Sequence, residues 1–237
     1  MLNVKHHFLR VINRMLFTYY IICSRYSKRK GTILTFHHVS DKLSSPYCVS
    51  PYNFELLLKK LSKMHVVKLE DFKQAENFFS LSFDDVPDDF YFNAYPLLKR
   101  YNIPFTLFIS TSLLDTDGYL SRYQLKEIAL NELATIGSHG VTHDYFVKFS
   151  REKFLEELKK SKEFIEELIG KPVQLFAFPY GSYTTSGLCY KHFVQEFYKY
   201  GFSTIPTDVT KRHNAPDYFV PRLNCNCLLY TSDAADE

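Results

Sequence analysis

The chain has 237 residues, of which 46% are hydrophobic and 23% charged, and a formal net charge of +3 at pH 7. These values are ordinary for a globular protein that buries a sizeable core, as one large domain or two small ones. Seven basic residues and no acidic residue lie in residues 1–30, so the remainder carries a net charge of −4 and is not expected to bind nucleic acid.

Residues 1–30 form a basic amphipathic N-terminal extension, in which apolar residues recur at helical spacing. Their uncharged stretch, residues 15–24, is shorter than the ~20 residues that span a membrane. We expect a helix that either caps the domain or makes peripheral contact with an anionic membrane surface. The five scattered cysteines do not form a disulfide framework. They indicate a reducing compartment and therefore a cytoplasmic protein.

From residue 31 onward, strand-like and helical segments alternate. Strands are expected at 32–36, 66–69, 79–83, 104–109, 134–138, 173–178, 202–204 and 218–223, and helices at 51–64, 71–79, 94–101, 121–131, 151–169 and 186–200. This alternation predicts an α/β fold with a parallel sheet, open or closed into a barrel. We assign residues 31–227 to one domain. Residues 228–237 break the pattern, and we interpret them as a tail that is not native.

Three of the predicted strands end in polar residues suited to catalysis. One runs into Asp84 and Asp85, another into His139 with His143 four positions later, and a third is followed by Tyr180. Neighbouring residues at a strand end point to opposite sides, so one carboxylate can hold a metal while the other moves a proton. Two histidines at i and i+4 together with one carboxylate leave metal positions open for water and substrate. Active sites of barrels form at such strand ends.

Four short motifs follow one another along the chain. They are Thr35-Phe36-His37-His38-Val39-Ser40, Ser82-Phe83-Asp84-Asp85, Ser138-His139-Gly140-Val141-Thr142-His143 and Phe176-Ala177-Phe178-Pro179-Tyr180-Gly181. Together they resemble the polysaccharide deacetylases of the NodB-homology type (carbohydrate esterase family 4), over residues 31–226. The resemblance implies a single-domain distorted (β/α) barrel and a metal-dependent hydrolase. Its substrate would be an N-acetylated, or less often O-acetylated, sugar of a polysaccharide, oligosaccharide or lipid-linked glycan.

The resemblance also implies roles for individual residues. Asp84 matches the catalytic base. Asp85, His139 and His143 match the ligands of a divalent metal ion, which we expect to be zinc. Tyr180 matches the residue whose backbone N–H helps to hold the oxyanion. These roles are chemically sound, because a bound metal polarises the acetamide carbonyl and lowers the pKa of its water, and an amide N–H stabilises the tetrahedral oxyanion.

This sequence departs from the family pattern at four places. Val86 stands where the family usually has glycine, and because valine tolerates a positive φ poorly we expect a different turn. Gly140 replaces the usual Ser or Thr, which removes a hydrogen bond beside the metal, a kind of loss that weakens binding ~10–100-fold. Ala177 replaces the arginine that usually orients the base. The Leu-x-His motif that supplies the general acid is not found.

Two substitutes are available. Arg222, at the end of the last predicted strand, is expected to pair with Asp84. His37 or His38, after the first strand, is expected to support the metal site or supply the acid, and we place His38 in the catalytic set. The departures also motivate an alternative, a catalytically inactive carbohydrate-binding module on the same fold. A glycosidase built on a carboxylate pair would leave the histidines of the third motif unexplained.

Overall fold

The computed structural model describes residues 30–42, 45, 47–186, 190–210 and 216–225. The predicted N-terminal extension therefore lies outside the described residues, except for Lys30, and so does the predicted tail. Among the residues that the structure describes, no helix is both long and apolar enough to cross a membrane.

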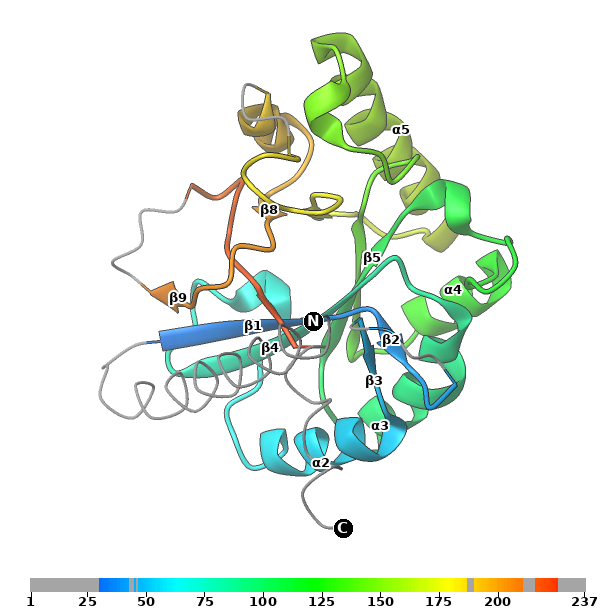
Figure 1. The fold of residues 1–237 in the computed structure, drawn as a ribbon, viewed down its shortest axis with the longest axis vertical. Coiled ribbons are helices and arrows are strands. Elements are labelled where there is room, and N and C mark those ends of the chain that lie inside the picture. Colours follow the sequence, from blue (N-terminus) through cyan, green and yellow to red (C-terminus); the bar gives the residue numbers. More distant parts are fainter. Residues whose placement is uncertain (1–29, 43–44, 46, 187–189, 211–215, 226–237) are drawn as a thin grey trace, which may run out of the picture.

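A parallel sheet forms the centre of the molecule and curls into a distorted barrel (Figure 1). In spatial order its strands are β10 (Leu223–Asn224), β1 (Lys30–Phe36), β4 (Phe78–Asp84), β5 (Phe105–Ile109), β6 (Ala134–Ser138), β7 (Leu175–Ala177) and β8 (Tyr200–Phe202). A short strand, β9 (Val209–Thr210), pairs antiparallel with β1. Strands β2 (His38–Val39) and β3 (Cys48–Val49) form a separate parallel pair.

The segment before β10 joins the two edges of the curled sheet. Val220 forms a parallel bridge with Phe202 of β8, and Leu223 then pairs with Leu34 of β1. The chain therefore crosses from the last strand to the first at this point, and it carries Arg222 across the gap. This crossing gives the distorted barrel, one of the two forms that the alternating pattern left open.

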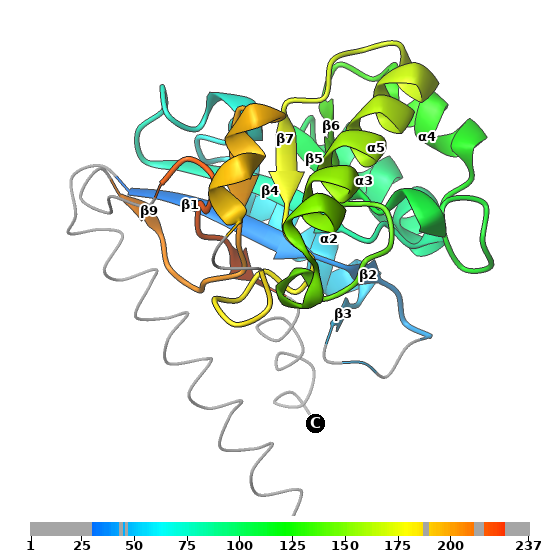
Figure 2. The same cartoon turned by 90° about the horizontal axis from the view of Figure 1, so that it is seen from above.

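Helices cover the outside of the sheet (Figures 1 and 2). They are α2 (Pro51–Leu61), α3 (Tyr95–Arg100) after the π-helical turn η2 (Phe90–Ala94), α4 (Arg122–Ala129) and α5 (Arg151–Ile169). Short 3-10 turns occur at η1 (Leu69–Asp71), η3 (Thr111–Leu113), η4 (Phe146–Lys148) and η5 (Lys191–Glu196). Ser150 caps the start of helix α5, where its hydroxyl accepts from the Lys153 amide, and Gly170 caps the end with φ 68°. Both ends follow the usual capping chemistry.

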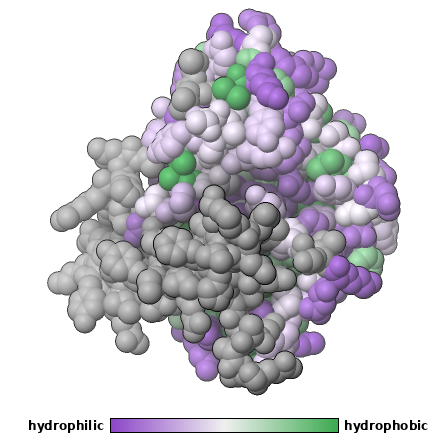
Figure 3. Space-filling view, viewed as in Figure 1, coloured by the Kyte–Doolittle hydropathy of each residue, from purple (hydrophilic) through white to green (hydrophobic). Residues whose placement is uncertain are grey.

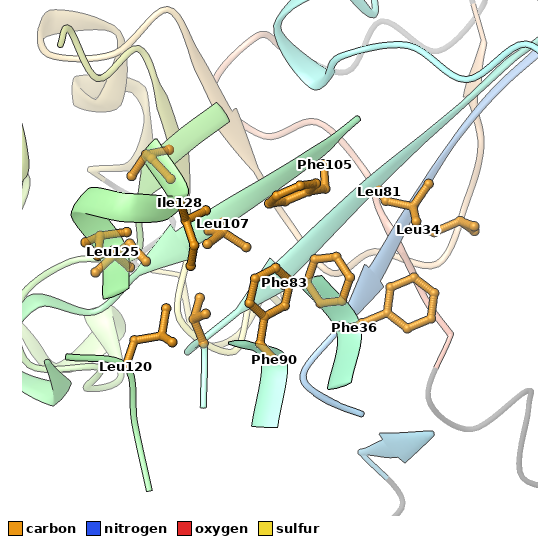
Figure 4. Close-up of a cluster of buried hydrophobic side chains, with 14 of the residues drawn as sticks. Leu34, Phe36, Leu81, Phe83, Phe90, Phe105, Leu107, Leu120, Leu125 and Ile128 are labelled. Atoms are coloured by element: carbon orange, nitrogen blue, oxygen red, sulfur yellow. The ribbon is translucent and has the colours of Figure 1, made fainter. Parts of the chain in front are cut away.

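Hydrophobic clusters lie on both faces of the sheet. The larger cluster fills the space between strands and helices. Its phenylalanines pack together in Figure 4, and they include Phe36, Phe83, Phe90 and Phe105. A smaller cluster lies on the other face and includes Ile33 of β1, Phe108 of β5 and Phe202 of β8. Because successive strand residues alternate between faces, Ser82 and Asp84 point to the same side as the smaller cluster, into the barrel. The described surface in Figure 3 is mostly hydrophilic or neutral, with hydrophobic residues in small separate patches.

Two expected helices are wrong in whole or in part. Residues 71–79 hold only the end of η1, because Asn77 has φ 51° and Phe78 already belongs to β4. Too few residues remain between these points for an α-helix. The segment 186–200 contains the 3-10 turn η5 in its described part instead of an α-helix, and β8 begins at Tyr200, within the range expected to be helical.

Two expected strands are much shorter than predicted. The strand at 66–69 reduces to a parallel bridge between Val66 and Phe79. The strand at 218–223 reduces to the Val220 bridge and the start of β10. Each segment pairs with the sheet at only one or two residues, so apolar composition alone overestimates its length.

Candidate active site

Asp84, the last residue of β4, is buried inside the barrel and held by Arg222. The Arg222 Nη1 and Nη2 atoms donate to Asp84 Oδ1 and Oδ2, each over 2.7 Å. The same guanidinium donates to Ser82 Oγ over 3.1 Å and to the Ser203 carbonyl over 3.0 Å. Burial raises the pKa of Asp84, but Arg222 and His139 more than offset this, so the pKa of the carboxyl lies below its ordinary value. A bidentate pair of this kind fixes both the charge and the orientation of the carboxylate.

The structure thus brings Arg222 to the carboxylate that an arginine at position 177 would orient in the family pattern. Position 177 instead contributes its main chain, because the Ala177 carbonyl oxygen lies 2.8 Å from His139 Nδ1. That contact places the hydrogen on Nδ1 and leaves the lone pair of His139 Nε2 available to a metal. Burial lowers the pKa of His139 by more than the two aspartates raise it, so this imidazole is neutral at pH 7.

Asp85, His139 and His143 converge on one point. Their ligand atoms all lie within 4.8 Å of one another. Asp85 Oδ1 is 2.9 Å from His143 Nε2 and 3.5 Å from His139 Nε2. This oxygen is buried and faces both imidazole nitrogens. A buried carboxylate needs a compensating positive charge, which either a proton on His143 or a metal ion supplies. The donor set of two imidazoles and one carboxylate therefore fits a metal ion between them.

The charges at this point are suited to a cation. Burial opposes the ionisation of Asp85, but the adjacent His143 and His139 more than offset it, so the pKa of Asp85 lies below its usual range. Burial also lowers the pKa of His143, and the neighbouring Asp85 outweighs that effect and raises it. In the protein without metal, a proton on His143 therefore takes the place of positive charge that a metal would supply.

The turn after the aspartate pair is left-handed, with φ 60° at Asp85 and φ 46° at Val86. Valine therefore adopts the positive φ that we expected it to avoid, and the expected difference from the family's turn stays a prediction. The Val86 amide donates to the Asp84 carbonyl over 2.6 Å. The Val86 side chain is only 1% exposed and belongs to the main hydrophobic cluster. Burial of this side chain compensates for a strained backbone, a combination found at functional sites.

Tyr180 lies beside His143, one of the three residues that could hold a metal ion. Its ring is 4.9 Å from the His143 ring and stacks on Tyr145, with centroids 4.0 Å apart and planes 10° apart. Its carbonyl accepts from Thr204 Oγ1 over 2.8 Å, and its backbone has φ 60°. The Tyr180 amide donates to no acceptor within the described ranges, so it is available to a ligand.

The two neighbouring histidines after β1 differ in their surroundings. His38 Nδ1 lies 2.7 Å from Asp89 Oδ2, and this hydrogen bond raises the pKa of His38 despite partial burial. Burial lowers the pKa of His37, which also interacts electrostatically with Asp84 and Asp85. His37 therefore interacts with the aspartate pair, whereas His38 is bound chiefly to Asp89. The catalytic roles expected for His38, Tyr180 and the other site residues stay predictions.

One buried residue at this site was missed by sequence reasoning. Glu157 of α5 is only 1% exposed and accepts hydrogen bonds from the loop between His139 and His143. No sequence signal marks it, because it lies in a helix whose many Glu and Lys residues match an ordinary solvated face.

The strand-end carboxylates, the two histidines and the curled parallel sheet define the class, a metal-dependent hydrolase on a distorted barrel. A family model described as polysaccharide deacetylase matches residues 72–191. The chain belongs to the polysaccharide deacetylase family. The predicted family, fold class and carbohydrate deacetylase activity are thereby confirmed, together with dependence on a metal.

Individual relatives agree with this assignment. The poly-beta-1,6-N-acetyl-D-glucosamine N-deacetylase of Staphylococcus aureus is 29% identical over 84% of this chain and 80% of its own length. A polysaccharide deacetylase from Bacillus cereus has a similar structure, with a TM-score of 0.74 and 25% identity, and the match covers 83% of this chain and 65% of that one. IcaB from Ammonifex degensii, at 23% identity and a TM-score of 0.71 over 83% of this chain and 91% of its own, supports the fold.

Proposed function

We propose that this chain removes N-acetyl groups from N-acetylglucosamine residues of a β-1,6-linked glycan, with zinc as the metal. The observation that carries the proposal is the paired arrangement at the end of β4, where Arg222 binds both oxygens of Asp84 while the adjacent Asp85 turns a buried oxygen toward His139 and His143. The similarity to the staphylococcal deacetylase supports the choice of glycan. Two imidazoles and one carboxylate are a donor set typical of catalytic zinc.

The residues of the chain divide the chemistry among them. Asp85, His139 and His143 would hold the metal, which when bound polarises the acetamide carbonyl and lowers the pKa of a water molecule. Asp84 is the proton acceptor, and its low pKa keeps it ionised at neutral pH. The free Tyr180 amide donates to the oxygen of the acetamide as negative charge develops there.

Arg222 keeps the base in place. Both oxygens of Asp84 accept from the guanidinium, so the carboxylate has one orientation before substrate arrives. Such preorganisation lowers the barrier, because no reorientation is needed during the reaction.

Acetate release from N-acetylglucosamine oligomers tests the proposal. We expect release from β-1,6-linked oligomers in preference to β-1,4-linked ones, and loss of release in Asp84→Asn and in His139→Ala. Metal binding should persist in Asp84→Asn and fall in His139→Ala, because only the second residue is a ligand. Equal release from both linkages would contradict the choice of glycan, and full activity of either variant would contradict the assigned roles.

The composition of residues 1–30 supports a further part of the proposal, peripheral contact with an anionic membrane surface. Co-sedimentation with phosphatidylglycerol vesicles should fall as salt is raised, and it should be lost when residues 1–30 are deleted. Binding that survives the deletion would remove this part of the proposal. The cytoplasmic location inferred from the cysteines stays a prediction.

A further inference from the structure

A buried carboxylate of α5 binds the loop that joins the two histidines of the site. Glu157 Oε2 accepts from the Val141 amide over 2.7 Å and from the Thr142 amide over 3.1 Å. Its Oε1 accepts from Thr142 Oγ1 over 3.1 Å. The Glu157 side chain is 0% exposed, and Lys153 Nζ lies 3.4 Å from Oε1. A carboxylate buried in this way is retained only where hydrogen bonds and charge satisfy it.

The loop held by Glu157 has an uncommon backbone conformation. Gly140 has φ 85° and His143 has φ 55°. A left-handed conformation at a residue other than glycine costs about 1–2 kcal/mol, and it persists only where the surroundings fix it. The two amides that Glu157 binds lie between these positions. The carboxylate therefore fixes the turn that brings His143 Nε2 to within 2.9 Å of Asp85 Oδ1.

The same contact explains the glycine in this loop. A Cβ added at Gly140 would lie 3.2 Å from Glu157 Oε2 and 3.1 Å from Phe146 Cζ. The absence of a Cβ at Gly140 thus leaves room for the Glu157 carboxylate beside the loop. The hydrogen bond that we expected to be missing beside the metal at Gly140 is offset by those that Glu157 accepts.

We propose that Glu157 is a positioning residue of the metal site. By binding the Val141 and Thr142 amides it holds His143 in the conformation that ligates the metal, although it touches neither metal nor substrate. This role rests on the proposed function, because it assumes a metal at the site. It assigns to α5, which has no residue in the family motifs, a part in metal affinity that acts through the histidine loop.

The variant Glu157→Gln tests the role. Glutamine keeps the size of the side chain but replaces one acceptor oxygen with an NH₂ donor, which cannot accept from the loop. The matched control is Glu166→Gln on the same helix. Glu166 Oε1 also accepts from a backbone amide, that of Val173, over 2.8 Å, and it lies 2.8 Å from Lys162 Nζ. It lies about 13 Å along the helix from Glu157, near the end remote from the histidines.

Metal-free wild type and both variants are titrated with Co²⁺, following its visible d–d absorption, and their unfolding by urea is measured without metal. We expect Glu157→Gln to bind Co²⁺ about 10–100-fold more weakly than wild type, with an altered d–d spectrum. Glu166→Gln should keep the affinity and spectrum of the wild type, although it too loses stability. A merely structural role for Glu157 would lower stability in both variants and leave the affinity of both unchanged.

The exposed Thr142 provides a second variant that does not threaten the core. Thr142→Val removes only the hydroxyl hydrogen bond to Glu157, so its Co²⁺ affinity should fall about two- to fivefold. Affinities of Glu157→Gln and Thr142→Val that stay within measurement error of wild type would overturn the role of Glu157 alone. A wild-type protein that takes up no Co²⁺ would overturn the proposed metal site, and the role of Glu157 with it.

Discussion

Replacing Arg222 with leucine removes the group that holds Asp84, the proposed catalytic base. Two hydrogen bonds to Asp84, at 2.7 Å each, are lost together with those to Ser82 and Ser203. Hydrogen bonds to charged groups contribute about 1.5–3 kcal/mol each, so the two to Asp84 alone give about 3–6 kcal/mol. Breaking a buried ion pair by removing one partner costs about 3–5 kcal/mol. We therefore expect the free energy of unfolding of Arg222→Leu at pH 7 to fall by about 3–5 kcal/mol.

The same change also alters the proton affinity of Asp84. Burial alone raises the pKa of this carboxyl, and Arg222 is the largest influence that lowers it. In wild type the ionised Asp84 contributes stability above its unfolded pKa, and that contribution is lost as the pH falls through its lower folded pKa. In Arg222→Leu the pKa of Asp84 in the folded protein rises, because burial is no longer offset by the guanidinium. Asp84 then loses its proton only at higher pH, so the acidic limb of the kcat/KM profile moves to higher pH.

Urea unfolding and the pH profile of acetate release check both parts of this prediction. The double variant Asp84→Asn/Arg222→Leu should recover part of the lost stability, because no buried charge is left unpaired. An Arg222→Leu protein with the urea midpoint and the acidic limb of wild type would refute the reasoning that Arg222 locks Asp84.

Variants at three further positions test other parts of the structure. Val86 has φ 46° and a buried side chain. Val86→Gly should destabilise the protein less than Val86→Ala does, by about 1 kcal/mol, because alanine keeps the backbone strain. A larger loss of stability in Val86→Gly than in Val86→Ala, measured by urea unfolding, would contradict this. Asp89 raises the pKa of His38. The pair therefore stabilises the fold fully below the unfolded pKa of about 6.5, and this contribution is lost as the pH rises through the folded pKa. The stability lost in His38→Gln should be larger at pH 5.5 than at pH 8.5, and an equal loss at both pH values would rule out this coupling. Gly140→Ala should cost about 1–2 kcal/mol of stability, because Gly140 has φ 85°. It should also weaken Co²⁺ binding, because the new Cβ crowds Glu157. A Co²⁺ affinity equal to that of wild type would show that the loop tolerates the crowding.

The strands that carry the site could be predicted because their ends are chemically marked. The apolar run before Asp84 and the run before His139 each end in residues that a core strand would not contain, and β6 has the predicted bounds. The pairing of Arg222 with Asp84 could also be predicted, because an arginine at the end of the last strand lies beside the first strands once the sheet closes.

Other features depend on tertiary contacts that no local pattern records. Val86 adopts a positive φ because its side chain is buried in the main cluster, which outweighs its intrinsic preference. Glu157 looks like its solvated neighbours in the helix, and only the approach of the histidine loop gives it a partner. The helix expected at 71–79 fails because β4 begins at Phe78. In each case the deciding partner is distant in sequence.

Metal content measured together with acetate release tests the central claim most directly. The purified wild-type chain should bind metal in a one-to-one ratio, as expected for a single site made by Asp85, His139 and His143. Removal of the metal by a chelator should abolish acetate release, and added Zn²⁺ should restore it, whereas Asp85→Ala should lose metal and activity together. Acetate release that is unaffected by the chelator, or that survives in Asp85→Ala, would contradict a deacetylase whose metal is held by these three residues.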